Sequence, residues 1–133
     1  MKKIALLFVL FISTLAASAA SVEIKRAWLD DYGYENDVYG RYAHVGFVIS
    51  NCRSQRCAVY VYMLDANGDL LKDSQGRIIF YRDYFTPSSN EAKFHDYRLF
   101  CKKANLHPRA YYLQIRIKDG DGNTIGKSSL LKL

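Results

Sequence analysis

The three cysteines are the residues of this chain with the strongest individual chemistry. Cys52 and Cys57 flank a four-residue polar segment, and Cys101 ends an apolar stretch. A hairpin at the polar segment would place Cys52 and Cys57 opposite each other, at a distance that a disulfide can bridge. We therefore expect a Cys52–Cys57 disulfide and a free thiol at Cys101, buried as a small apolar side chain. The alternatives are a bond from Cys101 to one of the other two, three reduced thiols, or a reactive Cys101.

The three histidines are His44, His95 and His107, and they form no catalytic or metal-binding pattern. No two of them have the close spacing of a metal site built from one segment. His95 and Cys101 would lie about 20 Å apart on a single strand, because a strand rises about 3.3 Å per residue. The chain also has no phosphate-binding glycine loop and no nucleophile elbow. We predict a protein that is not an enzyme, with no metal site and no cofactor.

Two acidic segments, residues 65–69 and 119–123, begin like calcium-binding loops, with oxygen-bearing side chains at alternate positions. The first then has Leu70 at the place of the sharp-turn glycine and Gly76 at the place of the bidentate carboxylate. The second has no closing carboxylate. We predict that both segments are hairpin turns, since Asn, Asp and Gly tolerate the positive φ angles of such turns.

Residues 30–40 have the composition best suited to recognition, with three tyrosines, four acidic residues and two glycines. Tyrosine gives a large contact area with few rotatable bonds. Aromatic rings also stack on sugars, and neighbouring carboxylates accept hydrogen bonds from the sugar hydroxyls. The predicted ligand-binding residues are Tyr32, Tyr34, Glu35 and Tyr39. The alternative is that these tyrosines pack back over the edge of the domain.

Alternation of apolar and polar residues predicts that β-strands position all of these residues. Residues 57–65 are apolar on both faces, as in a central strand, and residues 111–118 alternate, which indicates one buried and one wet face. The predicted strands are 22–29, 41–50, 57–65, 77–85, 93–101, 111–118 and 124–133. We predict an all-β fold, a single antiparallel β-sandwich of about seven strands and of immunoglobulin-like type.

Residues 1–20 have the pattern of a bacterial signal peptide. Lys2 and Lys3 precede an unbroken apolar run at residues 4–12, and small residues follow that fit a cleavage site near Ala20. Cleavage would leave a β-sandwich domain of residues 21–133 that is periplasmic or secreted. The alternative is a membrane anchor retained at the N-terminus. The mature chain has no apolar run of the roughly 20 residues that a membrane-spanning helix needs.

The expected mature chain carries 17 Lys and Arg against 13 Asp and Glu. Such an excess favours solubility more than any particular partner. Its cations do not follow one another as a basic stripe along the sequence, so we expect no nucleic-acid partner. The expected partner is a protein or a glycan at the cell envelope.

Several short motifs occur in order along the mature chain. They are Ala27-Trp28-Leu29-Asp30, Tyr34-Glu35-Asn36, Gly40 with His44-Val45, residues 71–76, Phe85-Thr86-Pro87, and Leu99-Phe100 followed by Leu106-His107. In this order they resemble a family of small all-β accessory domains found in exported bacterial proteins, alone or appended to longer secreted proteins that include peptidases. The resemblance implies a β-sandwich and no established activity. The chain departs from the pattern at Cys101-Lys102-Lys103, which replaces an apolar, proline-containing stretch.

These features predict an exported binding or accessory module without catalysis. One alternative is a secreted peptidase inhibitor that uses loops such as 30–40 or 86–92. Another is a subunit of a surface fibre or adhesin, in which residues 128–133 would form an exposed edge strand.

Overall fold

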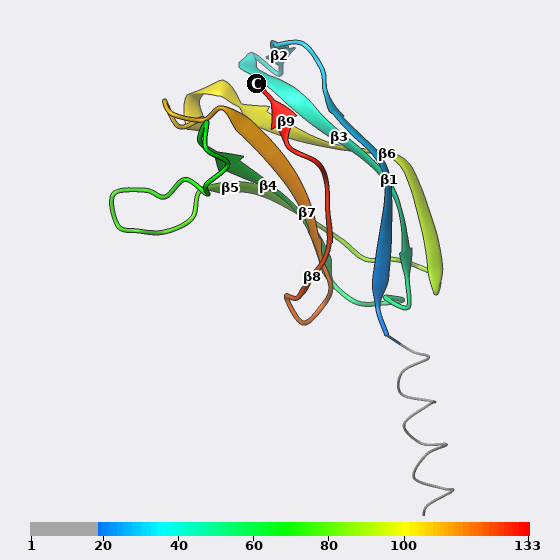
Figure 1. Cartoon of the computed structure of the whole chain (residues 1–133). Coiled ribbons are helices and arrows are strands. Elements are labelled where there is room, and N and C mark those ends of the chain that lie inside the picture. The colour runs from blue at the N-terminus through cyan, green and yellow to red at the C-terminus, as the bar shows by residue number, and fades with distance from the viewer. Residues whose placement is uncertain (1–18) are drawn as a thin grey trace, which may run out of the picture.

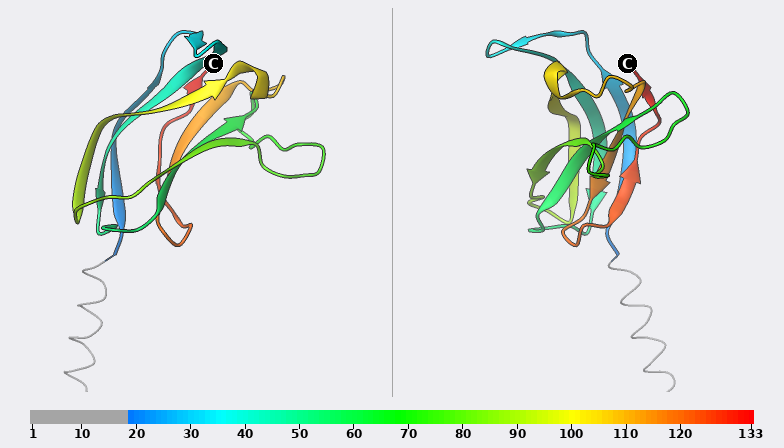
Figure 2. Two further views of the ribbon diagram at one scale, coloured as in Figure 1. Left: turned by 180° about the vertical axis from the view of Figure 1, so that it is seen from behind. Right: turned by 90° about the vertical axis from the view of Figure 1, so that its left-hand side faces the viewer.

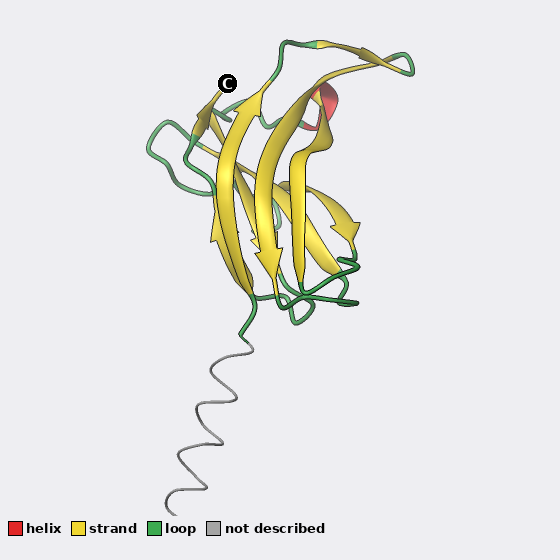
Figure 3. Cartoon of the chain, turned by 90° about the vertical axis from the view of Figure 1, so that its right-hand side faces the viewer, coloured by secondary structure: helices red, strands yellow, loops and turns green. Residues whose placement is uncertain are grey.

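The computed structural model describes residues 19–133, so the expected signal peptide, residues 1–20, lies almost wholly outside the described residues. The described chain is built from β-strands joined by turns, with one short 3₁₀ turn, η1 (Figures 1 and 3). The elements are β1 (Ser21–Leu29), β2 (Gly33–Glu35), β3 (Val38–Ser50), β4 (Cys57–Leu64), β5 (Phe80–Phe85), β6 (Glu91–Lys102), η1 (Lys103–Asn105), β7 (Tyr112–Lys118), β8 (Thr124–Lys127) and β9 (Leu131–Lys132). Within residues 19–133, no helix has the length and apolar character needed to cross a membrane.

The strands form two antiparallel sheets packed face to face, called sheet A and sheet B here (Figure 1). In sheet A, β3 lies between β1 and β6, and β2 pairs with the start of β3 beyond the end of β1. In sheet B the order is β5-β4-β7-β8, and β9 pairs with the other end of β7. The predicted all-β sandwich is therefore confirmed, with nine strands in the described residues where about seven were expected.

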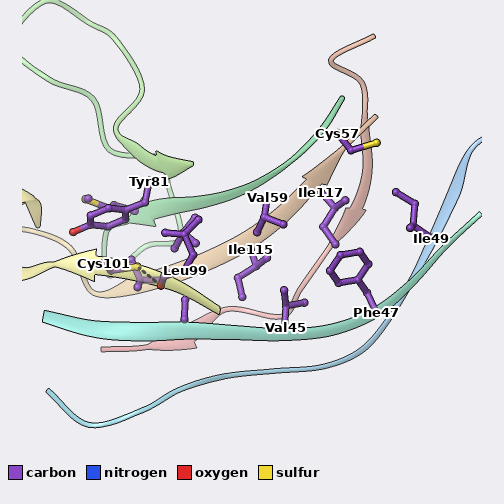
Figure 4. Close-up of a cluster of buried hydrophobic side chains, with 14 of the residues drawn as sticks. Val45, Phe47, Ile49, Cys57, Val59, Tyr81, Leu99, Cys101, Ile115 and Ile117 are labelled. Atoms are coloured by element: carbon purple, nitrogen blue, oxygen red, sulfur yellow. Dashed lines mark hydrogen bonds between the residues drawn. The ribbon is translucent and has the colours of Figure 1, made fainter. Parts of the chain in front are cut away.

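Apolar side chains from both sheets meet in one core (Figure 4). Its largest members come from β3, β4 and β7, and they are at most 1% exposed: Val45, Phe47, Ile49, Val59, Val61, Met63, Leu113, Ile115 and Ile117. Each such side chain contributes about 1.5–3 kcal/mol by leaving water. The predicted alternation of β7 is confirmed, because Leu113, Ile115 and Ile117 are buried between half-buried polar neighbours.

Specific contacts join the two sheets along both open sides of the sandwich. Between β5 and β6, the Tyr97 hydroxyl donates to the Asp83 carboxylate at 2.6 Å. Burial raises the pKa of Tyr97, and the hydrogen bond to Asp83 acts in the same direction. Between β1 and β8, Gly126 lies so close to Val22 that a Cβ atom would stand 2.9 Å from the valine Cγ1. Glycine is needed there because a side chain would push the sheets apart.

Three turns share one Asp-x-x-Gly-x construction. In the turn at residues 65–69, the Asp65 carboxylate accepts the backbone N–H groups of Asn67 and Asp69. Asp73 and Asp119 do the same at residues 73–77 and 119–123. The glycines have positive φ: Gly68 at 83°, Gly76 at 80° and Gly122 at 83°. Both segments predicted to be hairpin turns are confirmed, and their first carboxylates bind the backbone.

Three segments differ from the strands predicted by alternation. Residues 33–35, which were not predicted as a strand, form β2. The strand predicted at residues 77–85 begins only at Phe80, as β5, after an irregular excursion in which the Ile79 N–H donates to the Leu71 carbonyl. The predicted last strand is interrupted between β8 and β9, where the Ser128 hydroxyl accepts the N–H of Ile115. A hydroxyl thus replaces a backbone partner, and the expected continuous edge strand at residues 128–133 is not formed.

The predicted Cys52–Cys57 disulfide is wrong for this structure, in which all three cysteines are free and buried. The two residues flank a crossing between the sheets and not the predicted hairpin, because β3 belongs to sheet A and β4 to sheet B. Their thiols nevertheless lie in hydrogen-bond contact with each other, although no bond joins them. Burial raises the pKa of both thiols, that of Cys57 to about 12. The two thiols therefore stay protonated at neutral pH.

Candidate functional site

The tyrosine hairpin, residues 32–41, consists of β2, a two-residue turn and the first part of β3. It projects from one end of the sandwich (Figures 2 and 3). Tyr34 pairs with Tyr39, and Asn36 and Asp37 form the turn with φ angles of 48° and 66°. Positive φ at both central residues gives the turn a twist that matches the flanking strands. The segment predicted as a loop is thus an ordered two-stranded arm.

Three tyrosine rings gather on one face of this hairpin. The rings of Tyr32 and Tyr39 stack with their centroids 5.5 Å apart, and Tyr34 packs against Tyr39 at 5.1 Å. Tyr34 is 76% exposed and Tyr39 is 42% exposed. Three of the four predicted ligand-binding residues therefore form one aromatic surface that is open to solvent.

Glu35, the fourth predicted residue, lies on the opposite face of the hairpin. Side chains alternate along a strand, so Glu35 and its partner Val38 point away from Tyr34 and Tyr39. The pKa of Tyr42 is raised chiefly by burial, and a hydrogen bond to Glu35 acts in the same direction. Glu35 thus faces Tyr42 and is not part of the aromatic surface.

Cations flank the inner end of the tyrosine cluster. The guanidinium carbon of Arg41 lies 4.5 Å from the ring centroid of Tyr32, and the Lys103 ammonium lies 5.2 Å from the same ring. Cation–π contacts of this kind hold an aromatic ring in place and leave the cation hydrated on its other side. The hairpin therefore offers aromatic contact at its tip and positive charge at its base.

A group we call the histidine network lies beside the hairpin on the outer face of sheet A, and comprises Trp28, Asp30, His44 and Asp96. His44 Nδ1 lies 2.7 Å from Asp96 Oδ1, and its Nε2 lies 3.1 Å from Asp30 Oδ2. The indole of Trp28 stacks on the imidazole at 4.6 Å between centroids, with 7° between the planes. Only an imidazole that carries two protons can donate to both carboxylates.

Asp30 connects this network to the base of the tyrosine hairpin. Its carboxylate accepts the Tyr42 N–H at 2.7 Å, and its carbonyl accepts from Arg41 Nε at 2.9 Å. The same residue thus contacts His44 and fixes the point where the hairpin leaves the sheet. We assign Asp30 and His44 a positioning role for the hairpin.

Sequence reasoning missed this network, although part of its signal was present. Period-two alternation predicts that Trp28 and Asp30 lie on one face of β1 and its extension. It likewise predicts that Tyr42 and His44 lie on one face of β3. Asp96 is 52 residues from His44 in the sequence. Only the register between β3 and β6 brings those two side chains together.

A shallow hollow of about 580 Å³ lies next to the histidine network on sheet A. Its floor is Gly46, where a Cβ atom would stand 2.8 Å from the carbonyl oxygen of His95. Its charged lining consists of three cations and three carboxylates: Lys25, Arg26, Lys93, Glu23, Glu91 and Asp96. Because these charges balance, the hollow does not select a ligand by the sign of its charge.

The structure does not bring His95, His107 and Cys101 together. His95 is exposed, whereas Cys101 is buried and its pKa is raised to about 12 by that burial. The ring of His107 accepts the N–H of Arg109 in the loop before β7. Within residues 19–133, no group of three or more His, Cys, Asp or Glu side chains is placed to hold a metal ion.

Comparison of the chain with protein-family models, with curated proteins and with solved structures found no match. The geometry of the chain itself therefore carries the function proposed for it.

Proposed function

We propose that this chain is an exported binding module without catalytic activity, and that the tyrosine hairpin is its contact surface for a protein or glycan partner at the cell envelope. The observation that carries the proposal is the cluster of the exposed Tyr34 and Tyr39 with the half-buried Tyr32, on an arm that extends beyond the sandwich. Exposed aromatic side chains held in a fixed arrangement lose little conformational entropy when they bind.

The support for export comes from the N-terminal sequence and from two structural details. Strand β1 begins at Ser21, directly after the expected cleavage site. The thiolate is the form of cysteine that oxidises readily, so buried thiols with raised pKa values are compatible with an oxidising compartment. The resemblance to small accessory domains of exported bacterial proteins points the same way.

The order of strands supports the immunoglobulin-like part of the proposal. Sheet A takes β1, β3 and β6, and sheet B takes β4, β5, β7 and β8, so the chain crosses between the sheets three times. Crossings of this kind characterise Greek-key sandwiches, whose end loops commonly carry the binding residues. The tyrosine hairpin occupies such an end.

The test is capture of a partner from the native envelope by the mature domain. A photo-reactive amino acid at position 37, in the turn, would cross-link a partner bound at the hairpin tip. The double variant Tyr34→Ser/Tyr39→Ser should lose at least nine-tenths of the captured material, because it removes both exposed rings.

The matched control is Tyr111→Ser, which removes another exposed tyrosine, 39% exposed, from a different part of the surface. It should capture as much as the unmodified domain. Equal capture by the double variant and the control would overturn the hairpin as the contact surface. Turnover of a peptide, ester or glycan substrate by the purified domain would overturn the absence of catalysis.

The projecting shape of the hairpin also favours a second candidate, a secreted peptidase inhibitor. A rigid two-stranded arm can enter a cleft with little ordering cost. Slowed cleavage by a panel of secreted peptidases, lost in Tyr34→Ser/Tyr39→Ser, would select this candidate over the general binding module.

A further inference from the structure

The outer face of sheet B gathers cations and aromatic rings from four strands and from Arg56, the residue before β4. We call this surface the basic face, and its residues are Arg56, Tyr60, Tyr62, Phe80, Arg82, Tyr84, Arg116, Lys118 and Lys127. Strand register places Arg82 opposite Tyr60, Tyr60 opposite Arg116, and Arg116 opposite Lys127. Neighbouring strands lie about 4.8 Å apart, so this row of three cations spans about 14 Å across the sheet.

The cations lie over the aromatic rings. Arg56 stands 3.8 Å from the ring centroid of Tyr84, and Lys118 stands 4.2 Å from that of Tyr60. Arg116 stands 4.7 Å from Tyr62, which is only 5% exposed although it lies outside the core cluster. The rings therefore form a layer beneath the charges, and this layer limits the freedom of the long cationic side chains.

The positive charge of this face has no internal compensation. No Asp or Glu occupies an outward position of β4, β5 or β7, where the outward side chains of β5 are Phe80, Arg82 and Tyr84. The ion pairs found within residues 19–133 are Lys25–Glu23, Arg77–Asp73, His44–Asp30 and His44–Asp96. None of them involves a cation of the basic face. The neighbouring Asp83 faces the opposite way, toward the hydroxyl of Tyr97.

We propose that the basic face binds an anionic polysaccharide. An array of cations without carboxylates attracts a polyanion and releases its counterions on binding. Arginine also matches planar anionic groups through paired hydrogen bonds. Single-stranded nucleic acid suits the face less well, because it binds through bases stacked on open aromatic rings. Here Arg56, Arg116 and Lys118 already lie over ring faces.

This surface is separate from the tyrosine hairpin, since it is formed by Arg56 and by residues of β4, β5, β7 and β8. The inference therefore does not depend on the function proposed for the hairpin. These cations form no stripe along the sequence, because they are spread over residues 56–127 and come together only through strand pairing.

The experiment measures binding of the mature domain to polygalacturonate, heparin, dextran and oligodeoxythymidylate by calorimetry at 50 and 200 mM NaCl. We expect binding to at least one of the two anionic polysaccharides and none to neutral dextran. Affinity should fall about a hundredfold between the two salt concentrations if four to five cations make contact. Polygalacturonate carries carboxylates only, whereas heparin also carries sulfates, so the polysaccharide that binds shows which anionic group the face recognises.

Two double variants with the same loss of charge separate the basic face from net charge alone. Arg82→Gln/Arg116→Gln should weaken binding about tenfold or more at 50 mM salt. The control Lys25→Gln/Lys93→Gln, on the outer face of sheet A, should change it less than threefold, and thermal melting would check that both variants fold. Absence of binding, equal loss in both variants, or tighter binding to oligodeoxythymidylate through Arg82 and Arg116 would overturn the proposal.

Discussion

The outer face of sheet A and the outer face of sheet B differ in how their charges are compensated. On sheet A, His44 lies between Asp30 and Asp96, and the hollow beside them has equal numbers of cations and carboxylates. On sheet B, arginines and lysines lie over tyrosines, and no carboxylate occupies an outward position of β4, β5 or β7. The two sheets nevertheless cover the same core.

This difference separates polar groups that stabilise the fold from polar groups that are available to a ligand. A charge that is hydrogen-bonded within the protein resists removal, because its partner would be left unsatisfied. A hydrated charge above an aromatic ring adds little to stability and remains free to bind an anion. Substitutions on sheet A should therefore affect unfolding, and substitutions on the basic face should affect binding.

Of the four effects on stability predicted below, the largest is expected at Gly46 of sheet A. Gly46→Ala would place a Cβ atom 2.8 Å from the carbonyl oxygen of His95, and neighbouring backbone cannot move aside easily. We expect a loss of about 3 kcal/mol in the free energy of unfolding, measured in urea. Gly33→Ala is the control, because a Cβ atom at Gly33 meets nothing within 4 Å. Equal stability of the two variants would show that sheet A is not tightly constrained at Gly46.

The next effect is expected at the centre of the histidine network. His44→Ala removes the partner of both Asp30 and Asp96 and the ring that stacks on Trp28. We expect a loss of about 2 kcal/mol in the free energy of unfolding. His95→Ala removes an exposed histidine from the same sheet and should have little effect. A small loss in both variants would contradict the structural role assigned to the network.

The thiols beneath the two faces give a pH-dependent comparison of the sheets. The folded pKa values of Cys57 in sheet B and Cys101 in sheet A are raised to about 12, above the unfolded values near 8.5. The stabilising contribution is therefore complete below pH 8 and is lost as the pH rises toward 12. Each thiol should cost about 2 kcal/mol of stability by pH 10, because the unfolded chain loses that proton first.

Unfolding in urea at pH 8, 9 and 10 measures this loss. Cys101→Ala should remove its share of the pH dependence, and Cys57→Ala should remove a similar share. If both variants keep the full pH dependence of the unmodified domain, tyrosine or lysine titration is responsible and the thiols are not.

The smallest effect on stability is expected on the basic face. Arg82→Gln should change the free energy of unfolding by less than about 0.5 kcal/mol, because Arg82 is exposed and has no carboxylate partner. The same substitution should weaken polysaccharide binding. If Arg82→Gln destabilised the domain as much as His44→Ala does, the charged groups of the basic face would contribute to stability as those of sheet A do, and the contrast between the two faces would be wrong.

Much of the fold was predictable from period-two patterns. Alternation places Leu113, Ile115 and Ile117 in the core, and Asn67-Gly68 and Gly122-Asn123 mark real turns. A three-residue strand such as β2 gives no such pattern, because it is defined by its pairing across the turn at Asn36 and Asp37. Strand breaks made by a single side chain, as at Ser128, also have no periodic signal.

The errors at the candidate sites come from how the strands are arranged in space. The spacing of Cys52 and Cys57 predicted that their thiols face each other, and they are in contact, but at a crossing between the sheets and as free thiols. Contacts between distant strands, such as His44 with Asp96, depend on a register that one sequence does not encode locally. The tyrosine cluster was found because its members are near neighbours along the chain.

The excursion between β4 and β5 also has a practical use. It projects from the sandwich (Figure 2), and its turn at residues 73–77 is closed by the Asp73 carboxylate, with open space around Gly76. A fluorophore or short epitope attached at the exposed Gln75 would be carried away from sheet A, from the basic face and from the tyrosine hairpin. The protein thus provides a labelling position that leaves both proposed binding surfaces free, so that binding can be followed through the slower tumbling of the labelled domain.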